Sequence, residues 1–231
     1  MKRLYREVAV LAETEGFALA LDGKRVKTPA GQALAVAWRA LAEAIAAEWS
    51  DQGERVLPHT MPLMQLTATA LDRVASTRAA AVDQLVRYGE TDLLCYRAAE
   101  PPDLVARQTA MWQPLVDWAA LRFGAGLAVT AGLMPQPQPA AALAALRAAL
   151  EPVDPFGLAG LLAATGAAGS LVLALAIKER RLSADEAWAL SQLDETFQIE
   201  RWGEDHEAAK RRAALRADLL AAGRFLALAA G

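Results

Sequence analysis

The sequence predicts an α+β fold that is mostly α, in which a small N-terminal antiparallel β region precedes a larger helical C-terminal region. Three observations predict it. The 231 residues include 55 Ala and 35 Leu but only 16 Ile and Val together, a composition that favours helices over an all-β protein. Alternating patterns and turn signals are confined to the start of the chain, and helical periodicity dominates the rest. We expect two parts, a β-meander plus helices over 1–95 and a C-terminal helical domain over 96–231.

The predicted β-meander covers residues 4–36. Residues 16–21 alternate between large and small side chains, and the Asp-Gly pair at 22–23 is a strong hairpin signal. Residues 25–28 alternate again, and the Pro-Ala-Gly run at 29–31 predicts the next turn. A sheet this small needs a partner face to be stable, so we expect the next helix to cover it.

That helix is predicted over residues 37–50. Trp38, Leu41, Ile45 and Trp49 recur at spacings of three and four and form one apolar stripe. We assign Trp49 a structural role in this stripe. The substitution Trp49→Arg should therefore damage folding itself, because the new charge would be desolvated without a partner.

Helices account for most of the remaining chain. The helix that starts at Pro102 runs to about Phe123 and is expected to kink at Pro114. A short strand is expected over 124–132, followed by a stiff proline connector over 135–139. The other helices are predicted over residues 63–76, 78–89, 139–150, 156–166, 168–180, 184–202 and 204–229.

One uncharged run raises the alternative of a membrane-associated protein. Residues 156–177 hold no charge over 22 positions, a length that can cross a bilayer. However, Gly and Ala make up 11 of the 22, Gly166 and Gly169 interrupt the run, and no Trp or Tyr belt flanks it. We therefore expect two packed helices that meet near Gly166 in a buried core, and no membrane insertion.

Charge and residue inventory exclude several function classes. The net charge is −3 at pH 7, so no basic excess exists to neutralise nucleic-acid phosphates. Two distant His residues and a single cysteine, Cys95, provide no cluster with metal-ligand spacing, and we expect no metal and no cofactor. The first ten residues lack the apolar run of a signal peptide and the long acid-free stretch of a transit peptide, which predicts a cytoplasmic protein.

Motifs for catalysis are missing from the sequence. It has no phosphate loop, no nucleophile elbow and no dinucleotide-binding glycine pattern. We assign no catalytic residue and expect no enzyme. Because carboxylate pairs have no sequence signature, the alternative is a small-molecule enzyme in which Asp194, Glu195, Glu204 and Asp205 converge on a pocket.

The most informative segment is 184–207. Treated as one helix over 184–202, it places Leu190, Leu193 and Phe197 on one apolar face. Gly203 then ends the helix, which gives this glycine a structural role.

A second stripe of the same predicted helix mixes tryptophans with polar groups. Glu195 falls between Trp188 and Trp202, and Asp194 and Gln198 lie along the seam between the two stripes. A carboxylate at such a place either pairs with an arginine elsewhere in the chain or anchors an apolar docking surface. If Glu195 is an anchor, Glu195→Lys should abolish partner binding and leave the helical content intact.

Seven segments spread over nearly the whole chain carry a family resemblance. They are GFALALDGKRVKTPAG (16–31), LAEAIAAEW (41–49), TMPL (60–63), DLLCYR (92–97), LVxRQxxxWxPLxxWA (within 104–119), GSLVLALA (169–176) and LDETFQIERWGED (193–205). In this order and spacing they resemble the chaperones that assemble the catalytic head, F₁, of ATP synthase and attend its alpha subunit. This family comprises mitochondrial F₁ complex assembly factor two and its alphaproteobacterial relatives.

The resemblance implies a two-part, non-catalytic molecule without cofactor or small-molecule substrate. Its partner would be the free ATP synthase alpha subunit, whose beta-facing surface it would cover until the head assembles. The physical logic fits, because an unassembled subunit exposes an apolar interface that would otherwise self-associate. The resemblance also implies a bacterial cytoplasmic member, whereas eukaryotic relatives would lie in the mitochondrial matrix.

The resemblance further implies where the partner binds. An acidic position essential to the family maps onto the LDE run at 193–195, which leaves Asp194 and Glu195 both open. The family's WGED pattern matches residues 202–205, and its EW pair includes Trp49. The resulting partner-binding residues are Asp194, Glu195, Gln198, Trp202, Glu204 and Asp205, with Trp49 and Gly203 as structural residues.

Overall fold

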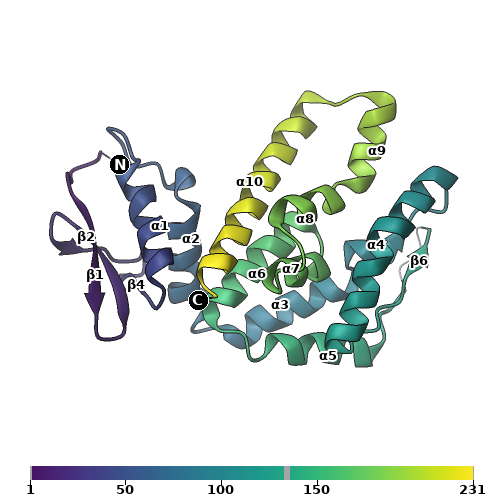
Figure 1. The fold of residues 1–231 in the computed structure, drawn as a ribbon, viewed down its shortest axis with the longest axis horizontal. Coiled ribbons are helices and arrows are strands. Elements are labelled where there is room, and N and C mark those ends of the chain that lie inside the picture. Colours follow the sequence, from purple (N-terminus) through teal and green to yellow (C-terminus); the bar gives the residue numbers. More distant parts are fainter. Residues whose placement is uncertain (1, 133–135, 231) are drawn as a thin grey trace.

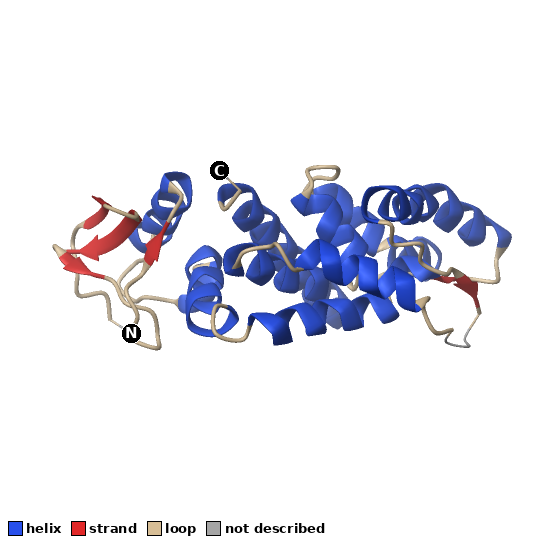
Figure 2. Cartoon of the chain, turned by 90° about the horizontal axis from the view of Figure 1, so that it is seen from below, coloured by secondary structure: helices blue, strands red, loops and turns tan. Residues whose placement is uncertain are grey.

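The N-terminal sheet and its covering helices lie at one end of the molecule, and the remaining helices form the other end (Figure 1). The computed structural model describes residues 2–132 and 136–230. Seen from below, strands are concentrated at the N-terminal end and helices make up almost everything else (Figure 2). The predicted α+β fold, mostly α, is confirmed.

The N-terminal sheet contains four antiparallel strands: β1 (Val8–Glu13), β2 (Gly16–Leu21), β3 (Lys24–Arg25) and β4 (Ala35–Val36). Strand β2 lies between β1 and β3 and also pairs with β4. The predicted turn at 22–23 is present, with positive φ at Asp22 and Gly23. Strand β3 is shorter than the alternation over 25–28 suggested, since beyond it only an isolated bridge joins Lys27 to Ala33.

Helix α1 (Arg39–Ser50) covers this sheet. A short 3₁₀ turn, η1 (Pro58–Thr60), leads to α2 (Pro62–Thr69), and α3 (Arg78–Glu90) follows. The helix predicted over 63–76 is interrupted, because residues Ala70–Val74 form a π-helical turn, η2. Such a turn has no simple sequence signal and is often found at functional sites.

The middle of the chain begins with a 3₁₀ turn, η3 (Leu93–Cys95), and continues as α4 (Pro102–Phe123), which runs through Pro114 without a break. The strand expected over 124–132 is only two residues long: β6 (Thr130–Ala131) pairs in parallel with β5 (Tyr96–Arg97). Part of the expected proline connector, Pro135, lies outside the described residues. Helix α5 (Ala140–Leu150) follows.

The uncharged run forms two helices, α6 (Pro155–Ala168) and α7 (Leu171–Lys178). They meet at Gly169, whose φ of 68° ends α6, and Ser170 caps α7. The junction predicted at Gly166 is therefore wrong by three residues, because Gly166 keeps a helical conformation inside α6. No helix in the described parts of the chain combines the length and hydropathy needed to cross a membrane.

The helix predicted over 184–202 is two helices, α8 (Ala184–Ser191) and α9 (Leu193–Trp202). Gln192, at φ −104° and ψ 17°, separates them. The stripe predicted to run from Trp188 to Trp202 is therefore wrong, because these two residues lie on different helices. Helix α10 (His206–Leu228) completes the chain.

Two buried clusters stabilise the fold, and α10 contributes to both. The N-terminal cluster includes Leu41 and Ile45 of α1 together with Phe225 of α10, whereas Leu219 and Leu226 join the larger helical cluster. Both clusters take residues from the first 95 positions, so the division into 1–95 and 96–231 stays a prediction about folding units.

Candidate functional site

Helix α9 is held on the helical part of the molecule by its buried face. Leu193 and Phe197 are both less than 5% exposed, as the sequence pattern predicted for this face. The last turn of α8, just before α9, is held by Trp112 of α4, whose indole Nε1 donates a hydrogen bond of 2.9 Å to the carbonyl of Leu190. The opposite face of α9 is therefore presented to solvent in a defined orientation.

Asp194 is half-buried at the α4–α9 contact. The side-chain amide of Gln108 donates to its Oδ1 at 2.7 Å, and the backbone N–H of Ala98 donates to the Gln108 Oε1 at 2.8 Å. Burial raises the pKa of the Asp194 carboxyl, and the Gln108 hydrogen bond and the Arg97 charge oppose this shift only in part. Within the described residues the second oxygen, Oδ2, accepts no hydrogen bond, so a fixed carboxylate has one oxygen left for a partner.

Glu195 and Gln198 differ from Asp194 in having no internal partner. Within the described parts of the chain, neither side chain forms a hydrogen bond or an ion pair. Glu195 is half-buried and Gln198 is exposed. The arginine pairing considered for the carboxylates of the LDE run is thus not found for Glu195, and Asp194 is held by an amide instead.

Two ion pairs clamp the outer end of α9 to α4. Arg107 lies 2.9 Å from Glu200, and Arg201 pairs with Asp103. Both guanidinium groups also lie over the ring of Phe197, with centroid distances of 5.3 Å and 4.2 Å. Their partial exposure makes each ion pair worth little in stability, but together they fix the orientation of α9.

Trp202 and Gly203 form the tip between α9 and α10. Trp202 is 75% exposed, which is unusual for the largest apolar side chain. Gly203 has φ 84° and ψ 169°, a conformation that is essentially restricted to glycine. The chain can turn sharply here only because this residue lacks a side chain.

The remaining predicted residues, Glu204 and Asp205, have roles within the fold. Glu204 forms an ion pair of 2.7 Å with Arg212, which also donates to the Gln192 side chain at 3.2 Å. Asp205 caps α10 by accepting hydrogen bonds of 3.0 Å from the backbone of residues 207 and 208. Together they brace the tip that presents Trp202.

The four carboxylates of the segment do not converge on a pocket. Asp194 accepts a hydrogen bond from the Gln108 amide, Glu204 pairs with Arg212, and Asp205 caps α10. Glu195 forms no hydrogen bond or ion pair with any described residue. The arrangement does not favour the small-molecule enzyme. Among the described residues no group of three or more His, Cys, Asp or Glu side chains is placed to hold a metal ion.

Trp49 lies away from this surface, on α1 at the N-terminal end. Its ring packs edge-on against Tyr5 with a centroid distance of 5.6 Å, and the Tyr5 hydroxyl donates to the Trp49 carbonyl at 2.7 Å. It packs against the N-terminal cluster, as expected for its stripe.

The residues of α4 that position α9 were not predicted from the sequence. Arg107 and Gln108 make the contacts described above, and Asp103 holds Arg201. A signal was present, because Arg107 and Gln108 form the RQ pair in one of the segments that carry the resemblance. No local pattern connects them with a helix some 90 residues later, so their role became visible only in the fold.

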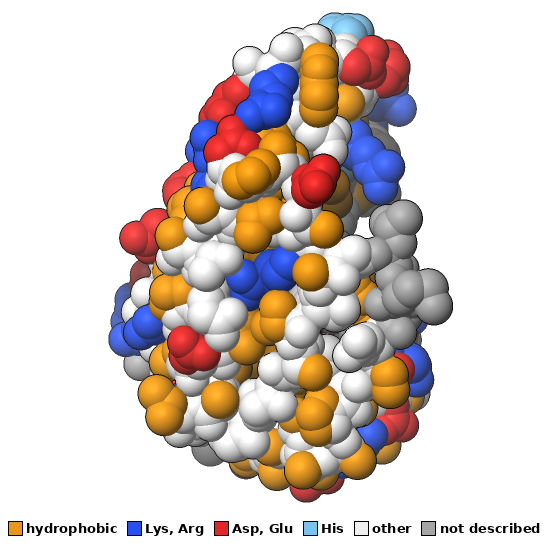
Figure 3. Space-filling view, turned by 90° about the vertical axis from the view of Figure 1, so that its right-hand side faces the viewer, with side chains coloured by type: hydrophobic (Ala, Val, Ile, Leu, Met, Phe, Trp, Pro, Cys, Tyr) orange, Lys and Arg blue, Asp and Glu red, His pale blue; other side chains and the backbone are white. Residues whose placement is uncertain are grey.

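The end of the molecule opposite the N-terminal sheet mixes apolar side chains with charges of both signs (Figure 3). We define the α9 surface as Asp194, Glu195, Gln198 and Trp202, braced by Gly203, Glu204 and Asp205. An exposed tryptophan beside accessible carboxylates on a rigidly seated helix is typical of protein–protein contacts. Fold and surface together are those of a mostly helical α+β protein with a candidate protein-binding surface.

Comparison with known proteins gives the family. Residues 2–120 match the family described as ATP12 chaperone protein. The crystal structure of Atp12 from Paracoccus denitrificans is 41% identical, with a TM-score of 0.93 over 99% of this chain and 98% of that chain. An aspartate-to-lysine mutant of the same Atp12p gives the same identity and TM-score over 99% of this chain and 97% of the other. The mitochondrial protein atp12 of Schizosaccharomyces pombe is 24% identical over 225 residues, covering 90% of this chain and 75% of its own length.

The chain therefore belongs to the ATP12 chaperone family. This membership confirms the resemblance found in the sequence and identifies the protein as an ATP synthase assembly chaperone.

Proposed function

We propose that the protein binds the free alpha subunit of ATP synthase and covers the surface destined for the beta subunit until the catalytic head assembles. The α9 surface makes the contact. The observation that carries this proposal is the half-buried Asp194 carboxylate, held through one oxygen by Gln108 and open at the other.

The Asp194 carboxylate suits the role of an anchor for physical reasons. Its orientation is fixed before binding, so little conformational entropy is lost on contact. It is already partly desolvated, so a cationic or amide donor of the partner gains more than it would at a fully hydrated carboxylate. Glu195 beside it adds a second, uncommitted charge, and Trp202 adds apolar area.

The proposed action is that of a holdase. An unassembled subunit exposes apolar interface, and reversible coverage keeps it from self-association. The contact needs no chemistry, which supports a non-enzymatic protein without a small-molecule substrate. We place this action in the bacterial cytoplasm, with the solved bacterial relatives as support.

The test uses the isolated alpha subunit from the same source. Wild-type protein should suppress light scattering by that subunit on dilution from denaturant and should co-elute with it on gel filtration. Asp194→Lys and Glu195→Lys should each lower the affinity at least tenfold and leave circular dichroism unchanged. Glu15→Lys, in the exposed β1–β2 turn at the other end, is the matched control and should bind normally. The proposal fails if the wild-type protein neither binds nor protects the alpha subunit.

A further inference from the structure

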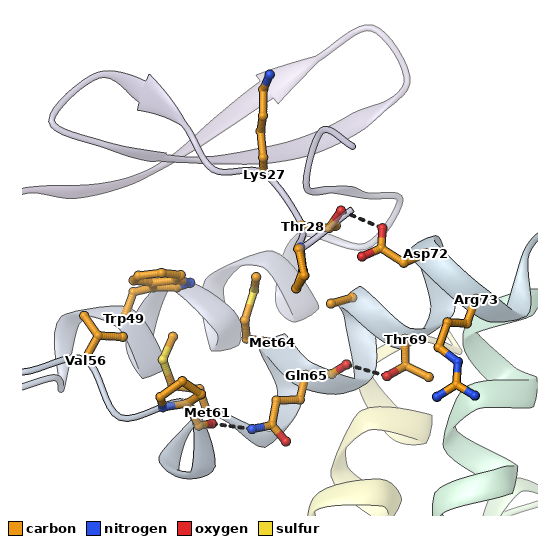
Figure 4. A pocket seen from close by; sticks show the side chains of 13 residues that line it. Lys27, Thr28, Trp49, Val56, Met61, Met64, Gln65, Thr69, Asp72 and Arg73 are labelled. Atoms are coloured by element: carbon orange, nitrogen blue, oxygen red, sulfur yellow. Dashed lines mark hydrogen bonds between the residues drawn. The ribbon is translucent and has the colours of Figure 1, made fainter. Parts of the chain in front are cut away.

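A long apolar groove crosses the N-terminal part of the molecule, far from the α9 surface. It consists of two adjoining cavities of about 600 Å³ and about 420 Å³, which share Trp49, Val56 and Lys27 as lining residues. We call it the Trp49 groove. Figure 4 shows the Trp49 ring close to the side chains of Met61 and Met64.

One wall of the groove is held in place by Glu48. Its carboxylate accepts hydrogen bonds from the backbone N–H of Leu63 at 2.8 Å and of Met64 at 2.9 Å, at the start of α2. Glu48 precedes Trp49 on α1, so this contact sets the spacing between the Trp49 ring and the two methionines. Burial raises the pKa of the Glu48 carboxyl.

The opposite wall is fastened by Asp72, which lies in the π-helical turn η2. Thr28 donates its hydroxyl to Oδ1 of Asp72 at 2.6 Å, and the Ala30 N–H donates to Oδ2 at 3.0 Å (Figure 4). These bonds join the loop after β3 to the helical side of the groove. The groove is therefore preformed, which lowers the entropic cost of filling it.

The lining chemistry indicates what fills the groove. Methionine side chains are flexible and polarizable, and they adapt to varied apolar side chains. An extended peptide complements this lining, because its alternate side chains lie on one edge and can all be apolar.

The charge at the rim is opposite to that of the whole chain. Five cationic side chains line the two cavities, against only two carboxylates, Asp22 and Asp72. Both carboxylates are occupied by hydrogen bonds from backbone N–H groups. Of the cations, Arg25 pairs with Glu13, and the others form no ion pair within the described residues: Lys2, Lys24, Lys27 and Arg73.

We propose that the Trp49 groove binds an extended acidic segment of the unassembled subunit, with its apolar side chains seated on Trp49, Met61 and Met64. The inference rests on the proposed function, since the segment belongs to the same alpha subunit. The chaperone then grips one client at two places of opposite charge, a cationic groove at one end and the acidic α9 surface at the other. Two linked contacts of this kind raise the overall affinity above that of either alone.

The test places a photo-crosslinker in the groove. Cys95 is buried and its pKa is raised to about 12 by that burial, so a newly introduced cysteine is labelled selectively. Thr69→Cys, on the groove wall, is labelled with benzophenone maleimide, and Arg87→Cys on the exposed side of α3 is the matched control. After irradiation of the complex with isolated alpha subunit, mass spectrometry should locate the position-69 crosslinks in one segment rich in Asp or Glu and apolar residues.

A second measurement does not depend on the label. Lys27→Glu with Arg73→Glu should weaken binding of fluorescein-labelled alpha subunit about tenfold in an anisotropy titration. Arg87→Glu with Arg180→Glu makes the same change in net charge elsewhere on the surface and should stay within twofold.

The outcomes separate the two proposals. Suppose that a complex forms, but position 69 crosslinks nothing and the variant with Lys27→Glu and Arg73→Glu binds normally. The groove proposal is then overturned and the proposed function stands. If no complex forms with wild-type protein, both are overturned. A third outcome is that the wild-type protein pellets with phosphatidylglycerol vesicles and the variant with Lys27→Glu and Arg73→Glu does not, while its affinity for the alpha subunit is unchanged. The groove would then bind lipid, and the proposal would also be overturned.

Discussion

The Gln108 amide and the Asp194 carboxylate, 86 positions apart in the chain, are joined by a hydrogen bond of 2.7 Å. Because the Gln108 Oε1 is occupied by the Ala98 N–H, its amide nitrogen has to point at Asp194. The bond therefore orients a charged group on the surface of α9 from inside α4. It also distinguishes two neighbouring acids that the sequence left equivalent, since Glu195 has no such support.

Removing the donor should cost stability. Gln108 is 1% exposed, so Gln108→Ala leaves a buried cavity and an unpaired Ala98 N–H. We expect the free energy of unfolding to fall by about 2–3 kcal/mol, measured by urea denaturation. Gln198→Ala, on the exposed side of α9, is the control and should change it by less than about 0.5 kcal/mol. Equal effects of the two substitutions would contradict the role given to Gln108.

The raised pKa of Asp194 makes a signed prediction about pH. Its native carboxyl holds a proton more firmly than the unfolded one, so its contribution to stability grows as pH falls through the native pKa and is lost as pH rises again. Asp194→Asn keeps an oxygen for Gln108 but cannot titrate. The unfolding free energy of the wild type relative to this variant should therefore increase from pH 7 to pH 4 in urea titrations. A decrease over this range would show that the native pKa is lowered.

Gly203 should tolerate no side chain. At φ 84° and ψ 169° an added Cβ is strained whatever space surrounds it. We expect Gly203→Ala to lower the free energy of unfolding by about 1–3 kcal/mol in urea denaturation. Gly53 has no positive φ and open space around it, so Gly53→Ala should be nearly neutral. A neutral Gly203→Ala would mean that the tip relaxes to another conformation.

Trp49 and Trp202 should differ in how much they contribute to folding. Trp49 packs on Tyr5 and the N-terminal cluster, so Trp49→Arg should lower the free energy of unfolding by about 3 kcal/mol or more. Trp202 is 75% exposed, so Trp202→Arg should leave the melting temperature nearly unchanged and weaken binding of the alpha subunit. Calorimetry and gel filtration of both variants check this. A Trp49→Arg variant with the wild-type melting temperature, or a Trp202→Arg variant with a strongly lowered one, would contradict this assignment.

The sequence was most informative where local chemistry decides the structure. The Asp22-Gly23 turn and the stripe over 37–50 rest on short-range rules, and both appear in the fold. The α6–α7 break was predicted three residues early, because two glycines offered equivalent signals and only Gly169 adopts positive φ.

The predictions that were wrong concern places where contacts between distant parts of the chain decide the structure. Gln192 separates α8 from α9 although no Gly or Pro marks the place, and the π-helical turn at 70–74 is equally unmarked. The segment over 184–202 was treated as one helix, but the burial predicted for Leu190, Leu193 and Phe197 is correct. The helical periodicity of this segment carries no information about α4, whose Gln108 and Arg107 orient the α9 surface.

Contact between the α9 surface and the unassembled alpha subunit is best checked by hydrogen–deuterium exchange of the protein, alone and in complex with the isolated subunit. We expect slower exchange of the amides of Leu193–Trp202 in the complex, and no such protection when Asp194→Lys replaces the wild type. Unchanged exchange across Leu193–Trp202 in a complex that is nevertheless formed would contradict it.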